Sequence, residues 1–139
     1  MTLEEKINRY RSIPKRIAEL EIDKDICTSV KAVQYDSIGD AKGTPENNAE
    51  RKMVDAAAIS AEITELEKEH ASIRLELKDS IDQAICGEDI HSVDMRMVLK
   101  SHLLQNVPLN QVAKKVVHRD YSATRKMYQE GFAMLKNLT

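Results

Sequence analysis

The sequence predicts an all-α protein, with an N-terminal helical hairpin or coiled coil followed by a C-terminal domain of three helices. The chain has no Trp, one Phe, four Gly and three Pro, against 32% charged residues. This composition is poor for sheets and good for long helices. A heptad pattern in the middle of the chain, with one gap at Ser80, and shorter helical patterns after Gly87 predict the two-part organisation.

Length and apolar content set the broad class. A chain of 139 residues forms one or at most two small domains. The first residues, MTLEEKINRY, contain no apolar run, and no window approaches 18 consecutive apolar residues, so neither a signal peptide nor a membrane span is expected. Cys27 and Cys86 are expected to be free, reduced thiols, and the protein is expected in the cytoplasm of a bacterial host cell.

The first segment has the apolar spacing of a helix interrupted by a proline. Its periodic residues are Leu3, Ile7, Tyr10, Ile17, Leu20 and Val30. Pro14 lacks a backbone N–H and fits best in the first turn of a helix, so the sequence predicts a break near Ser12 and a second helix continuing to residues 28–33. Gly, Pro, Asn and Asp residues then predict a loop at about 34–47.

The longest predicted helix follows, from Asn48 to Ile85, with Asn47 or Asn48 as its N-cap. Its apolar residues follow heptad spacing over four heptads and give a rod of roughly 55 Å at 1.5 Å per residue. Because the first segment is shorter than this rod, part of the stripe is expected to pack against another subunit, with a dimer favoured. The expected oligomerisation residues are Ile59, Ile63, Leu66, His70, Ile73 and Leu77. A polar residue on such a stripe commonly sets register, which is the role expected for His70. Residues 1–86 are thus predicted to form one helical hairpin or coiled-coil region that mediates oligomerisation.

Charge is unevenly distributed between the two regions. Residues 1–86 hold 13 Lys/Arg and 18 Asp/Glu, a net charge of −5, whereas residues 87–139 hold 8 and 5, a net charge of +3. Within 105–139 the count is 6 against 2. An acidic first part and a basic tail indicate one part for assembly and another that meets an anion.

The second region, residues 87–139, contains three short helical patterns. Gly87 ends the rod, and the first helix includes VDMRMVLKSHLL. QNVP separates it from LNQVAKKVV, and HRD makes a turn before a last helix that Ser122 is expected to cap. Two helices joined by a tight turn, with a basic last helix, outline a helix-turn-helix.

A helix-turn-helix binds double-stranded DNA through the outward face of its last helix. Arg and Gln side chains read base edges with two hydrogen bonds each, and Ser and a helix N-terminus can hold a phosphate. The residues expected on that face are Ser122, Ala123, Arg125, Lys126 and Gln129. The residues expected to meet the DNA backbone from the preceding helix and turn are Lys114, Lys115, His118 and Arg119.

The whole chain resembles a family of small phage and prophage proteins, the late-gene transcriptional activators of the RinA and ArpU type, whose C-terminal part is similar to region 4 of bacterial sigma factors. The matching segments are MTLEEKINRYRSIPKRIAELE, CTSV, GDAKGTPENN and AAISAEITELEKEH, followed by Val112-Ala113, Ser122, Met127-Tyr128, Gly131-Phe132 and Leu135. The resemblance implies a sequence-specific transcriptional regulator, an activator of late genes, in which Ser122, Arg125, Lys126 and Gln129 read DNA. One departure is the interval from Ala113 to Ser122, which is nine residues where the family usually has six.

Two other functions stay open. One is a helical scaffolding protein whose C-terminal bundle binds another protein, with RNA polymerase as a candidate partner. The other is a small terminase-like DNA-packaging subunit, because such subunits also join a helix-turn-helix to an oligomerising part. An enzyme is not expected, because no catalytic triad, Gly-rich phosphate loop or HExxH motif is present. No cofactor or metal site is expected either.

Overall fold

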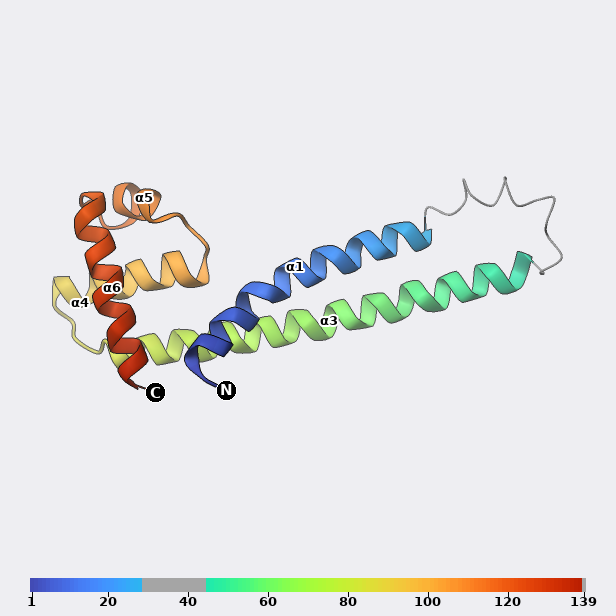
Figure 1. Ribbon diagram of the computed structural model, residues 1–139, viewed down its shortest axis with the longest axis horizontal. Coiled ribbons are helices and arrows are strands. Elements are labelled where there is room, and N and C mark those ends of the chain that lie inside the picture. Colours follow the sequence, from blue (N-terminus) through green and yellow to red (C-terminus); the bar gives the residue numbers. More distant parts are fainter. Residues whose placement is uncertain (29–44, 139) are drawn as a thin grey trace. The chain divides into compact units, whose positions relative to one another are not determined.

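The computed structural model describes residues 1–28 and 45–138 (Figure 1). Within these ranges the chain is helical and contains no strand, so the prediction of an all-α protein is confirmed. The elements are α1 (Leu3–Thr28), α3 (Pro45–Ala84), α4 (Ile90–Leu99), η2 (Lys100–Leu104), α5 (Leu109–Gln111), η3 (Val112–Val116) and α6 (Tyr121–Leu138). In the described part of the chain, none of these helices has a stretch both long and apolar enough to span a bilayer.

The described residues divide into two compact units. The two-helix unit contains Ile7–Ala71, and the C-terminal unit contains Met1–Lys6 together with Ser72–Thr139. The sequence predicts a division at Gly87, where α3 has ended, but the two units divide further upstream, inside α3. The last turns of α3 belong to the C-terminal unit because Leu77, Ile81 and Ile85 are buried there.

Helix α1 runs through Pro14 without interruption, so the predicted break near Ser12 is wrong. Pro14 itself is exposed, while Tyr10 and Ile13 beside it are 1% and 0% exposed. Burial of these two side chains offsets the missing backbone hydrogen bond, which costs about 3 kcal/mol in a helix interior. Ser12 does not cap a second helix, because its hydroxyl donates back to the carbonyl of Arg9 at 2.9 Å.

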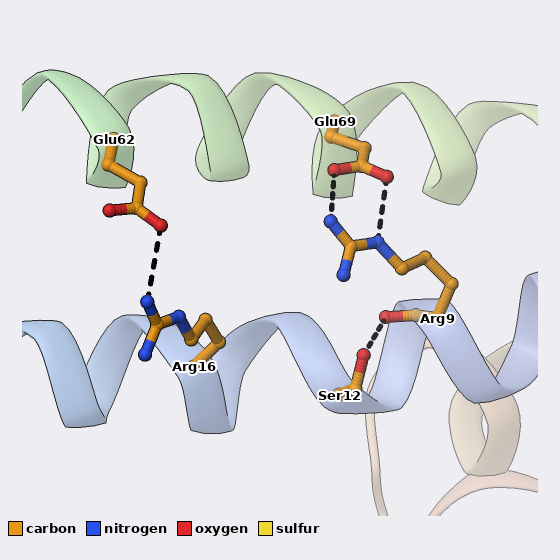
Figure 2. Close-up of polar contacts among 5 residues, drawn as sticks. All are labelled: Arg9, Ser12, Arg16, Glu62 and Glu69. Carbon is orange, nitrogen blue, oxygen red and sulfur yellow. Dashed lines mark hydrogen bonds and ion pairs between the residues drawn. The ribbon is translucent and has the colours of Figure 1, made fainter.

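Two ion pairs hold α1 antiparallel to α3 in the two-helix unit (Figure 2). The Arg9 guanidinium donates to both carboxylate oxygens of Glu69, at 2.8 and 2.7 Å, and Arg16 Nη2 lies 3.3 Å from Glu62 Oε1. The hydrogen bonds from Arg9 lower the pKa of Glu69 below its ordinary value. Apolar side chains of both helices are buried in the same unit, among them Ile13 of α1 and Leu66 of α3.

The predicted oligomerisation stripe is largely covered within this single chain. Three of its residues are buried and three are half-buried: Leu66, Ile73 and Leu77 in the first group, and Ile59, Ile63 and His70 in the second. The His70 ring stacks on the ring of Tyr10, with centroids 4.3 Å apart and planes 8° apart. Burial of Leu66, Ile73 and Leu77 within one chain leaves less of the stripe for a second subunit, and the oligomer remains a prediction to be tested in solution.

Helix α3 begins at Pro45, so the loop predicted to reach residue 47 ends earlier, and neither Asn47 nor Asn48 is the N-cap. Proline is favoured at the first helical position because its fixed φ already matches the helix and its missing N–H is not needed there. The rest of the predicted loop, at 34–44, and the predicted end of the first helix beyond Thr28 lie outside the described residues.

The C-terminal unit packs α4, η3 and α6 around one apolar cluster. Val98, Val112, Val117 and Met127 form its centre. Helices α4 and α6 approach closely at Gly131, where an added Cβ would lie 2.9 Å from side-chain atoms of both Met95 and Leu99. Asp89 is the N-cap of α4, because Ser92 donates its backbone N–H and its hydroxyl to the Asp89 carboxylate.

Polar contacts attach the start of this bundle to the end of α3. Arg96 Nη1 donates to the carbonyl of Ile85 at 2.7 Å and also to the carbonyl of Gly87. Lys100 Nζ donates to Asp82 at 2.6 Å, which lowers the pKa of that carboxyl. The carbonyls at the end of α3 therefore have a cationic partner, which also complements the helix dipole.

Two of the short helices end in the same unusual way. The last turns, η2 and η3, are π-helical, and each is followed by a residue with positive φ: Asn106 at 56° and His118 at 54°. The backbone N–H groups of Val107 and Arg119 then donate six residues back, to Ser101 and Ala113, both at 3.0 Å. Asn and His are among the residues that tolerate this conformation best.

Candidate nucleic-acid interface

Asp120, and not the predicted Ser122, caps the helix that carries most of the predicted DNA contacts. Helix α6 begins at Tyr121, and the backbone N–H of Ala123 donates to the Asp120 carboxylate at 3.1 Å. The buried Thr124 hydroxyl donates to the Asp120 carbonyl at 2.9 Å. A carboxylate is favoured at this position by both the hydrogen bond and the helix dipole. Ser122 lies in the first turn, where its side chain is exposed.

Replacement of Asp120 by alanine is expected to lower the free energy of unfolding by about 1 kcal/mol, the usual cost of losing an N-cap. Thermal melting followed by circular dichroism measures this change. Asp120→Asn is the matched control, because asparagine keeps an acceptor for the N–H of Ala123 and is expected to melt close to the wild type. A Ser122→Ala variant that loses more stability than Asp120→Ala would contradict the assignment of the cap.

The predicted base-reading residues share one exposed face of α6. From the 3.6-residue repeat, Ser122, Arg125, Lys126 and Gln129 lie within an arc of about 100°. All four are exposed. The opposite face is the buried one and consists of Thr124, Met127, Gly131 and Leu135. Ala123, the fifth predicted residue, is half-buried and lies at the border of the two faces.

The predicted backbone-contacting residues lie on the preceding π turn and the connection to α6. Lys114 and Lys115 are on η3 and are exposed. His118 is exposed and holds the positive φ that ends the helix. Arg119 differs from the others, because its guanidinium is engaged with Asp94 of α4 at 3.1 Å.

The exposed cations are available to an anion. Among the described residues, Arg125, Lys126, Lys114 and Lys115 are exposed and have no hydrogen-bond or ion-pair partner. The nearest acidic side chain along the helix, Glu130, lies 3.8 Å from the imidazole of His91. This arrangement can bind phosphates by charge and base edges by paired hydrogen bonds.

Two residues of this region were not expected from the sequence, namely Asp94 as the partner of Arg119 and Asp120 as the cap. Asp120 carried a readable signal, because Asp followed by a helical pattern is a common N-cap. Asp94 carried none, because its partner lies 25 residues away. Among the described residues, no group of three or more His, Cys, Asp or Glu side chains is placed to hold a metal ion.

Comparisons with known proteins give no identification. A scan of protein-family models found no match to the chain, and searches of curated proteins and of solved structures found no match either.

Proposed function

We propose that the C-terminal unit is a helix-turn-helix that binds double-stranded DNA, and that the chain is a phage-type, sequence-specific transcriptional regulator, an activator of late genes. The observation that carries the proposal is the face of α6 on which Ser122, Arg125, Lys126 and Gln129 are exposed together, opposite the buried face. The resemblance to the RinA and ArpU type of activators supports the same function.

The roles of the side chains follow from their chemistry. Arg125 and Gln129 would read base edges in the major groove, because each can make two hydrogen bonds to one base. Lys126, Lys114, Lys115 and His118 would meet phosphates and fix the position of the helix on the duplex. The carboxylate of Asp120 at the N-terminus of α6 disfavours a phosphate on the helix axis, so the basic side chains and not the helix end would carry the backbone contacts.

The assembly of the chain separates this proposal from its alternatives. A regulator is expected to be a dimer, with RNA polymerase as a second partner, whereas a small terminase-like subunit is expected to form rings. A scaffolding protein would bind its partner without binding a duplex. Sedimentation velocity of the full chain distinguishes dimers from rings.

The double variant Arg125→Ala/Lys126→Ala is expected to abolish duplex binding while leaving the fold intact, because both side chains are exposed. Binding of a labelled, random-sequence duplex is measured by fluorescence anisotropy across a salt series. For the wild type, log K should fall by about 0.9 per decade of salt for each phosphate contact. Arg125 is expected to contribute base reading as well, so selection from a randomised duplex library should recover a preferred site with the wild type only.

The matched control is Arg11→Ala/Lys15→Ala, which removes the same charge from exposed positions of α1 in the two-helix unit. It is expected to bind the duplex as the wild type does. Equal binding by the wild type and the α6 variant would contradict the assignment of the α6 face. Equal weakening by both variants would show that net charge alone, and not this face, determines binding.

A further inference from the structure

We infer that Asp94 is a positioning residue that holds Arg119 in place to bind a phosphate of the DNA backbone. The inference rests on the proposed function and adds to it the group that orients Arg119, one of the residues already expected to meet the DNA backbone. Asp94 is in α4, outside every segment so far assigned to DNA contact.

In this pair the Asp94 carboxylate is the more buried group and the Arg119 guanidinium is the more exposed one. Arg119 Nε donates to Asp94 Oδ2 at 3.1 Å, and Nη2 lies 3.1 Å from the same oxygen. The Asp94 side chain is only 15% exposed, whereas that of Arg119 is 43% exposed. Neither contact uses Nη1, so the guanidinium keeps donors for a second acceptor on its solvent side.

The backbone fixes the same residue a second time. The N–H of Arg119 donates to the carbonyl of Ala113 at 3.0 Å, closing the turn that follows η3. Arg119 therefore has both its main chain and its side chain held, whereas the neighbouring lysines on η3 have long side chains that would lose rotamer freedom on binding. A guanidinium already in one orientation loses less entropy when it binds a phosphate.

The place of Arg119 in the sequence suits a contact with the DNA backbone. It lies two residues before the first residue of α6, and in the sequence it stands between the cations of η3 and the exposed residues of α6. The Asp120 carboxylate occupies the adjacent helix end. A phosphate is thus directed toward the outer edge of Arg119 and away from the helix axis.

The Asp94→Ala variant distinguishes a positioning role from a simple effect of charge, because the two predict opposite changes in the affinity for the duplex. Removing a carboxylate adds one positive charge, which alone should tighten duplex binding. Loss of positioning should weaken it, by about 10-fold, as is usual when the partner orienting a binding group is lost. The salt slope should also fall by about 0.9, because one phosphate contact is lost. Glu88→Ala, which removes an exposed carboxylate of the same unit, is the charge control and should not weaken binding.

Further variants keep the test independent of folding. Asp94→Asn retains an acceptor oxygen and should recover most of the affinity, and Arg119→Lys, which keeps the charge but not the two contacts, should weaken binding. In an Arg119→Ala background, Asp94→Ala should cause no further loss. The duplex is the labelled random-sequence probe, and circular dichroism confirms the helical content of each variant.

The outcomes are distinguishable from failure of the proposed function. A wild-type chain that does not bind the duplex removes both the function and this inference. A wild type that binds, with Asp94→Ala binding equally or more tightly, removes this inference alone. A loss on Asp94→Ala that persists undiminished in the Arg119→Ala background also overturns it, because the carboxylate would then act through another group.

Discussion

Replacement of Tyr10 by alanine is expected to lower the free energy of unfolding by about 3–5 kcal/mol, the range for truncating a buried aromatic residue. The side chain is 1% exposed, and its ring stacks on that of His70 at 4.3 Å. Stacked pairs add about 0.5–1.5 kcal/mol to the burial of their area. Alanine would therefore leave a cavity between α1 and α3 and remove the stack at once.

Urea denaturation followed by circular dichroism measures the loss, and hydrogen exchange locates it, with α1 and the first half of α3 expected to lose protection. Tyr10→Phe is the conservative variant, because it keeps the ring, and it should cost much less stability than Tyr10→Ala. Tyr121→Ala truncates a tyrosine that is 50% exposed and should also have a small effect. Equal midpoints for Tyr10→Ala and Tyr121→Ala would show that Tyr10 does not join the two helices.

Replacement of Gly131 by leucine is expected to cost about 3 kcal/mol, the upper end for overpacking a core. A Cβ alone would lie 2.9 Å from Leu99 Cδ1 and from Met95 Cγ, which is closer than carbon atoms approach without repulsion. A branched side chain at this point forces α4 and α6 apart and disturbs the cluster around Val98 and Met127.

Two matched variants make this test specific. Gly131→Ala gains about 1 kcal/mol of helix propensity, but its methyl group meets Leu99 Cδ1 and Met95 Cγ at 2.9 Å, so it should destabilise the protein less than leucine does. Ala133→Leu adds the same side chain at an exposed position of α6 and should be close to neutral. Thermal melting of the three variants ranks their stabilities. A Gly131→Leu variant as stable as Ala133→Leu would contradict the close approach of α4 and α6.

The helical elements could be predicted from the sequence wherever apolar periodicity was strong. The heptad stripe from Ile59 to Leu77 gave α3 almost to its last residue, and Gly87 and Pro108 correctly marked interruptions. Pro14 misled the prediction because local propensity favours a break there, whereas burial of Tyr10 and Ile13 stabilises an unbroken helix. Contacts between distant residues decided that outcome, and no local window contains them.

The candidate site was predictable in part. The exposed face of α6 could be predicted from the helical repeat, because apolar and charged residues each recur along this segment with a period of 3.6 residues. The cap was misplaced by two residues, since Asp120 and Ser122 are both favourable cap residues. The pairing of Asp94 with Arg119 was not predictable, because it depends on how α4 packs beside the turn before α6.

The two wide helix ends have a consequence for the segments that follow them. A π turn holds one residue more than an α turn, so residues after Leu104, and again after Val116, are displaced by one place relative to a bundle with ordinary ends. The direction of the apolar face of α6 therefore depends on the turn before it, because one residue more or fewer rotates a helix by about 100°.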